Sequence, residues 1–185
     1  MMEIMLSGFV LFIGVHLFPS LPGTKDGLTQ KLGTRGYKGL FALASLIGMI
    51  VIVMGMGRVE WTLLWVAPVW GRALTLSAMP FVIVLLCAAH MPCNIKRIIR
   101  HPMLWAVVLW SMLHLTANGD LASTILFGGF ALFSIIMMIL INRRDPKPEV
   151  VKVPWFKDVI VLALGGFIYM GILHSHQYFT GVPIT

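Results

Sequence analysis

Histidines are the residues of this sequence best suited to chemistry, because an imidazole can ligate a metal or exchange a proton near neutral pH. An ionisable side chain inside a membrane span is costly and marks a functional site by default. Each histidine alone is also explained by a hydrogen bond to a neighbouring helix, but several together favour a ligand role, for example toward haem iron. Four of them lie within or at the ends of apolar stretches: His16, His101, His114 and His174. Two more lie near such ends and are the next candidates: His90 and His176.

The segment around His114 carries the most closely spaced polar groups. Ser111, His114 and Asn118 are spaced i, i+3 and i+7, so on a helix they share one face. A hydroxyl and an amide beside an imidazole can fix its tautomer, as outer groups do at metal sites. The residues that follow have a structural explanation, because Asn-Gly favours a tight turn and Asp120 is a good N-cap for the next helix.

Six apolar stretches would position these side chains, and each approaches the length of about 20 residues that spans a bilayer as a helix. The sequence therefore predicts an all-α, polytopic membrane helix bundle of about six transmembrane helices. It also predicts a single domain over residues 1–185. The expected spans run from Ile4 to Pro19, Gly39 to Met56, Leu74 to Met91, His101 to Ala117, Leu121 to Ile141 and Val159 to His174.

Composition agrees with a membrane protein, because 58% of the 185 residues are hydrophobic and only 11% are charged. A soluble domain carries about 25% charged residues. The net charge of +7 does not indicate a nucleic-acid-binding surface, because the Lys and Arg residues lie in short loops between apolar spans. There they orient the chain and contact anionic lipid headgroups. We expect the lipid bilayer as a partner and no nucleic acid; the oligomeric state stays open.

The loops predict the orientation. Cytoplasmic loops of membrane proteins carry an excess of Lys and Arg, and the odd-numbered loops here hold nearly all of these residues. Only Arg58 and Arg72 lie in the even loops or the termini. Both termini are therefore expected outside. The basic residues of the odd loops are Lys25, Lys31, Arg35 and Lys38, then Lys96, Arg97 and Arg100, then Arg143, Arg144, Lys147, Lys152 and Lys157.

The two cysteines, Cys87 and Cys93, fall near the cytoplasmic end of one span in this topology. Cytosolic thiols stay reduced, so a structural disulfide is not expected. Their spacing is not typical of a metal pair, and we interpret them as inert thiols.

Several short motifs together resemble the NnrU family of bacterial membrane proteins, and the resemblance covers nearly the whole chain. The central motif combines Arg100-His101-Pro102-Met103 with Trp110 and His114. The other matching stretches are Gly14 to Pro19, Gly33 to Leu43, Asn118 to Ser123, Leu126-Phe127-Gly128, Leu173-His174 and Gly181-Val182-Pro183.

The resemblance implies a multi-pass protein of the bacterial inner membrane, linked to denitrification and nitric oxide metabolism. The family is similar to zeta-carotene isomerase, a membrane haem b enzyme that isomerises a cis double bond of a polyene. Its axial ligands are attributed to an early histidine and to one after an Arg-His-Pro motif, which correspond to His16 and His114. Ser111 stands where that enzyme has a cysteine. The resemblance thus implies a haem b site, with activity as an isomerase or as an assembly factor for nitrogen-oxide reductases as alternatives.

Depth in the membrane leaves the ligand pair open. In the predicted topology His16 and His114 lie near opposite ends of their spans, which separates them in depth by roughly 10–15 Å. Ligands of one iron each lie about 2 Å from it. His174 is close in depth to His114, and His101 is close in depth to His16. Resemblance therefore favours His16 with His114, depth favours His114 with His174, and His114 belongs to both pairs.

Two other functions are less favoured by the sequence. The Arg-His-Pro motif also resembles that of membrane methyltransferases, but Asn142 to Glu149 lacks their acidic and aromatic pattern. Proton-coupled transporters usually carry an acidic residue inside a span, and all seven acidic residues lie outside the predicted spans.

Overall fold

The structure is a computed structural model, and it describes residues 1–21, 23–146 and 148–181. Two features used above lie outside the described residues: Lys147 of the fifth loop, and Val182 and Pro183 of the C-terminal motif.

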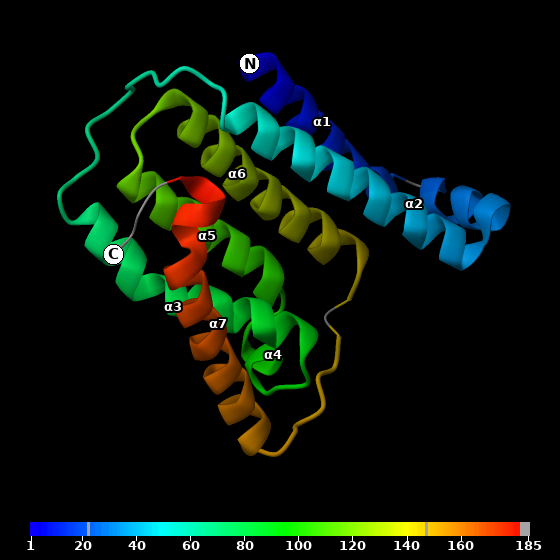
Figure 1. Cartoon of the computed structure of the whole chain (residues 1–185). Helices are drawn as coiled ribbons and strands as arrows, with labels where there is room; N and C mark the ends of the chain where they lie inside the picture. Colours follow the sequence, from blue (N-terminus) through cyan, green and yellow to red (C-terminus); the bar gives the residue numbers. More distant parts are fainter. Residues whose placement is uncertain (22, 147, 182–185) are drawn as a thin grey trace. The chain divides into compact units, whose positions relative to one another are not determined.

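The described residues fold almost entirely into helices, as predicted (Figure 1). Among them, the only extended pairing is an isolated antiparallel bridge between Leu63 and Asp120. The elements are α1 (Met2–Leu17), the 3-10 turn η1 (Phe18–Ser20), α2 (Thr24–Met56), α3 (Gly71–His90), α4 (Ile95–Ile98), α5 (Pro102–Ala117), α6 (Leu121–Arg144) and α7 (Phe156–Thr180).

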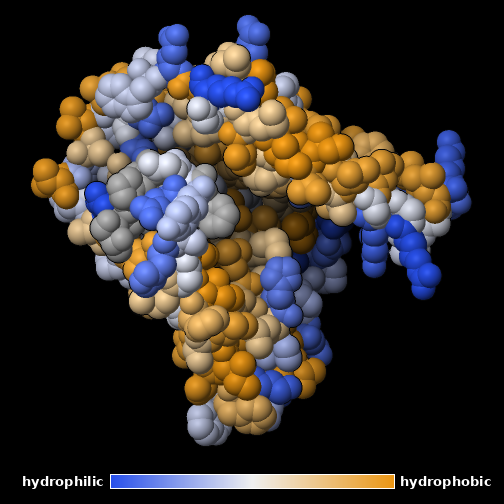
Figure 2. Space-filling model, in the orientation of Figure 1, coloured by the Kyte–Doolittle hydropathy of each residue, from blue (hydrophilic) through white to orange (hydrophobic). Residues whose placement is uncertain are grey.

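Five of the described helical segments are long and apolar enough to cross a membrane: Met2–Ser20, α2, α3, α6 and Phe156–Tyr178. The sixth predicted span is α5, which is apolar but has only 16 residues. At 1.5 Å per residue it is about 24 Å long. Apolar side chains cover much of the outer surface of the helices (Figure 2). The prediction of a polytopic membrane protein with about six spans is confirmed.

Helix α2 is longer than the predicted span, because it begins at Thr24 rather than Gly39. The added segment is too polar for a membrane span, but Lys, Gln and Leu are good helix formers. The helix is broken at Gly33, whose φ of 70° and ψ of 164° are not helical. Glycine adopts this backbone conformation without a steric penalty, so the chain changes direction there and continues as helix on both sides.

The chain divides into two compact units, Met1–Thr62 and Leu63–Thr185, and the prediction of a single domain stays a prediction. In the first unit, α1 and α2 form a hairpin held together at glycines. A Cβ atom on Gly8 would lie 2.6 Å from the Ile52 nitrogen, and one on Gly48 would lie 3.0 Å from the Phe12 nitrogen. Small residues allow such close helix packing in membranes.

In the second unit, α3 lies between α5 and α7, and α6 packs on α5 (Figure 1). The Thr75 hydroxyl donates to the Leu113 carbonyl at 2.7 Å, which joins α3 to α5. The Tyr169 hydroxyl donates to the Leu76 carbonyl at 2.7 Å, which joins α7 to α3. The predicted cap of α6 is confirmed, because the Asp120 carboxylate accepts from the Ser123 backbone N–H at 2.9 Å.

The loops after α3 and α6 meet at one end of the second unit. The Arg100 guanidinium donates to the Asp145 carbonyl at 2.8 Å. Asn94 donates through its side chain to the Val153 carbonyl at 2.8 Å and to the Asp158 carboxylate at 2.6 Å. The third and fifth loops, which are both basic, therefore lie at the same end of this unit. This is required if both loops lie in the cytoplasm.

The glycine contacts of the hairpin predict opposite effects for two alanine substitutions in α2. A Cβ on Gly55 would clash with the Met5 backbone, whereas one on Gly39 meets no atom within 4 Å. Gly39→Ala should therefore raise the free energy of unfolding by about 0.5–1 kcal/mol, the usual gain from removing a helical glycine. Gly55→Ala should lower it by roughly 1–3 kcal/mol, as overpacking does. Thermal unfolding in detergent, followed by circular dichroism, measures both; equal shifts would contradict this packing.

The charge distribution predicts that both termini lie outside and that the odd-numbered loops lie in the cytoplasm. Reporter fusions after Thr185, in the 57–70 loop and in the 145–155 loop would test this. An alkaline phosphatase reporter should be active at the first two sites and inactive at the third. Cytoplasmic reporter activity at the C-terminus would overturn the orientation.

Candidate functional site

His114 lies on α5, and its hydrogen bond defines its tautomer. Its Nδ1 lies 2.8 Å from the Trp110 carbonyl oxygen, one helical turn earlier. A carbonyl only accepts, so Nδ1 carries the proton in this bond and Nε2 keeps the lone pair of a neutral imidazole. No other hydrogen bond of this ring is found among the described residues. His114 therefore presents the nitrogen that a metal ion would use.

Aromatic side chains from two helices surround this imidazole. Phe127 of α6 stacks on the ring, with centroids 4.7 Å apart and planes at 29°. Trp110 lies 5.2 Å from the His114 ring and contacts Phe127 at 4.9 Å and Phe130 at 5.9 Å. These rings hold the imidazole in one orientation and limit the water that reaches it. We call His114, Trp110, Phe127 and Phe130 the His114 cluster.

Ser111 and Asn118 act differently from the sequence interpretation, in which they set the tautomer of His114. Asn118 donates its side-chain amide to the His114 backbone carbonyl at 2.8 Å, so it closes the end of α5. Ser111 is fully buried, and its hydroxyl has no hydrogen-bond partner among the described residues. The tautomer is set by the Trp110 carbonyl instead, a contact available to any histidine on a helix.

A further histidine lies near the end of the last helix. The Nδ1 atom of His176, on α7, lies 3.0 Å from the Thr180 hydroxyl. His174, the partner that membrane depth favours, is exposed and donates Nδ1–H to the Met170 carbonyl at 2.7 Å. The sequence made His176 a later candidate than His174. The two histidines are only two residues apart on one helix, and without their contacts the sequence cannot tell which is the better ligand.

His16 belongs to the first unit and repeats the pattern of His114. Its Nδ1 lies 2.8 Å from the Phe12 carbonyl, so Nε2 again carries the lone pair. Its ring lies 4.2 Å from that of Phe12 and 5.0 Å from that of Phe41. His16 and His114 thus have the same tautomer, and each is contacted by aromatic side chains of its own unit. Their pairing on one iron stays a prediction.

His101 is the candidate least suited to bind iron through Nε2. It precedes Pro102 at the start of α5, and its Nε2 lies 2.9 Å from the side-chain oxygen of Asn142 on α6. This bond joins the two helices at the basic end of the second unit. His101 is therefore explained by packing between helices.

Other metal-binding groups are not assembled in the described part of the chain, which contains no cluster of three or more His, Cys, Asp or Glu side chains. Cys87 and Cys93 are both buried and free. The Cys93 thiol donates to the Ala88 carbonyl at 3.6 Å. An iron held by one or two imidazoles needs no such cluster, so haem remains compatible with these residues.

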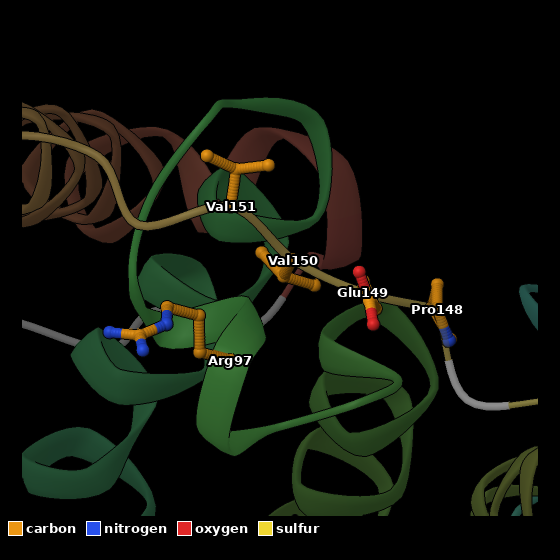
Figure 3. Close-up of a pocket in the computed structure, with 5 residues that line it drawn as sticks. All are labelled: Arg97, Pro148, Glu149, Val150 and Val151. Atoms are coloured by element: carbon orange, nitrogen blue, oxygen red, sulfur yellow. The ribbon is translucent and has the colours of Figure 1, made fainter.

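A hollow of about 430 Å³ lies at the basic end of the second unit. Its lining residues are Arg97, Pro148, Glu149, Val150 and Val151. The Arg97 guanidinium points away from the Glu149 carboxylate (Figure 3). No histidine lines this hollow, so it is separate from the chemistry of the His114 cluster.

The hydroxyls of Thr75 on α3 and Ser111 on α5 should contribute differently to stability. Thr75→Val removes the hydrogen bond to the Leu113 carbonyl and should cost about 0.5–1.5 kcal/mol. Ser111→Ala removes a buried hydroxyl without a partner, so it should be neutral or stabilise by up to about 1 kcal/mol. Thermal unfolding of both variants in detergent compares them. If Ser111→Ala is as destabilising as Thr75→Val, the serine has a partner that the described residues do not supply.

Comparison with known proteins identifies the family. The family model described as NnrU protein matches residues 4–184, which include the His114 cluster and nearly all of both units. No curated protein and no solved structure matches the chain. Because this match covers nearly the whole sequence, the chain belongs to the NnrU family.

Proposed function

We propose that this chain is a haem b-binding protein of the bacterial inner membrane that acts in denitrification or nitric oxide metabolism. The observation that carries the proposal is the state of His114: Nδ1–H is held by the Trp110 carbonyl, and Nε2 keeps its lone pair. Imidazole nitrogen is a common axial ligand of haem iron. The link to nitrogen oxides rests on the resemblance to the NnrU family.

The side chains of the His114 cluster have separate roles in this proposal. His114 would hold the haem iron through Nε2. The Trp110 carbonyl holds the ring against rotation, and Phe127 covers one of its faces. The second ligand would come from His16, as the resemblance implies, or from the end of α7, where His174 and His176 lie. Bound haem would supply an iron centre able to bind nitric oxide or to transfer an electron.

Ser111 separates this proposal from the isomerase alternative. The related carotenoid isomerase has a cysteine at this position. The neutral Ser111 hydroxyl is a much poorer iron ligand than a thiolate, and here it is fully buried. Binding or redox chemistry with histidine ligands is therefore favoured over a reaction that exchanges histidine for cysteine. An assembly factor for nitrogen-oxide reductases would bind such a partner and show no turnover.

A visible absorption spectrum of the protein purified in detergent is the direct test of haem binding. We expect a Soret band in the purified protein or after addition of hemin, with a pyridine haemochrome typical of haem b. The absence of a Soret band even after hemin addition would overturn the proposal. Adding nitric oxide to the reduced protein should shift the band, because bound haem would supply an iron that takes up the gas.

Substitution of single histidines tests the ligand assignment. His114→Ala should lose most of its haem or change its spin state, because the iron loses an axial donor. Added imidazole should restore the spectrum, an effect that lost packing alone would not show. His101→Ala is the matched control, since its Nε2 is already bonded to Asn142. His16→Ala and His174→Ala identify the second ligand.

Two outcomes would change the assignment. If His114→Ala keeps the wild-type spectrum while another variant loses haem, then His114 is not the central ligand, although haem binding stands. If all four variants keep their haem, the ligands lie elsewhere and His90 and His176 are tested next.

A further inference from the structure

The first unit contains an apolar groove between α1 and α2, with a volume of about 440 Å³. Along α1 and the first residue of η1 the groove extends from Val10 to Phe18, a length of about 12 Å. Among the described residues that line it, Tyr37 supplies the only hydroxyl group. The described residues that line it are Val10, Leu11, Gly14, Val15, Phe18, Leu28, Tyr37, Leu40, Phe41 and Ala44.

The break of α2 at Gly33 shapes one end of this groove. Leu28 and Leu40 both line it, although an unbroken helix would separate them by about 18 Å. The non-helical backbone of Gly33 turns the start of α2 back toward α1. The groove is therefore closed at this end by the part of α2 that is too polar to lie within a membrane.

Three exposed lysines lie close in sequence to residues that line the closed end of the groove. Lys25 and Lys31 lie three residues before and after Leu28, so they flank it on the same side of the helix. Lys38 follows Tyr37, and all three lysines are exposed. Asp26 is the only acidic residue between Phe18 and Phe41. Hydrophilic side chains gather at this end of the hairpin, while apolar ones cover its length (Figure 2).

We propose that this groove binds an anionic diacyl phospholipid. One acyl chain lies along the apolar wall between α1 and α2. The phosphate lies at the closed end, within reach of Lys31 and Lys38. The lysines and the apolar wall of the groove follow the same order as the headgroup and the acyl chain of a lipid in the bilayer. The basic segment that carries these lysines is expected at the cytoplasmic headgroup layer. A neutral apolar molecule would use the wall of the groove but would gain nothing from the lysines.

Native mass spectrometry of the full chain in detergent tests the proposal. The protein is titrated with phosphatidylglycerol or with phosphatidylcholine carrying the same acyl chains. We expect tighter retention of phosphatidylglycerol. Lys31→Gln with Lys38→Gln should weaken phosphatidylglycerol binding about fivefold for each lysine removed and leave phosphatidylcholine unchanged. Lys31→Arg with Lys38→Arg keeps both charges and should keep the preference.

Gly14→Leu tests the apolar part of the site. Gly14 lines the groove, and a Cβ added there meets no atom within 4 Å, so a leucine side chain would begin in open space beside the groove. Leucine is also a better helix former than glycine, so the variant is expected to fold. It should reduce the retention of phosphatidylglycerol while the lysines stay in place. Helix content and size-exclusion profile, compared with the wild type, verify the fold.

A matched pair of basic residues supplies the control. Lys152→Gln with Lys157→Gln removes the same charge from another basic segment, outside the groove, and should weaken phosphatidylglycerol retention much less than Lys31→Gln with Lys38→Gln. Equal retention of the two lipids by the wild type would overturn the proposal. So would unchanged retention in both the Lys31/Lys38 glutamine variant and Gly14→Leu, or an equal loss in the control. None of these measurements depends on haem, so this site and the proposed function can fail separately.

Discussion

In a lipid environment, a polar side chain on a spanning helix finds no water to bond, and its nearest acceptor is a carbonyl of its own helix. The hydroxyls of Ser45 and Ser175 donate to the carbonyl four residues earlier. His16, His114 and His174 use the same carbonyl through Nδ1. This one constraint gives all three histidines the same tautomer, with the lone pair on Nε2. The hydrogen bond that makes an imidazole tolerable in the membrane is thus also the one that prepares it to bind a metal.

The helices and their apolar character could be predicted from the sequence, because a spanning helix must carry a continuous apolar run. The Asp120 cap could be predicted too, because capping depends on neighbouring residues alone. The helical start of α2 could not be predicted from hydropathy, which finds membrane spans and ignores polar helices. The break at Gly33 could be recognised only from the backbone angles, since most glycines of the described helices have ordinary helical conformations and do not interrupt them.

The candidate site was predicted in its residue types but not in its contacts. His114 could be identified because an intramembrane histidine on a polar face is uncommon. The stacking of Phe127 depends on how α6 packs against α5, which the sequence leaves undetermined. The predicted role of Ser111 and Asn118, to set the tautomer of His114, was wrong for the same reason, because residues on one helical face need not contact each other. Asn118 reaches the backbone of His114 rather than its ring.

The shortness of α5 has a consequence for access to His114. A helix of about 24 Å does not match a hydrocarbon core of about 30 Å, and a bilayer relieves such hydrophobic mismatch by thinning beside the short helix. His114 lies three residues before the last residue of α5, or about 4.5 Å along the axis. Local thinning brings the aqueous phase toward that end. A small dissolved molecule would then have only a thin apolar barrier to cross before it reached the imidazole.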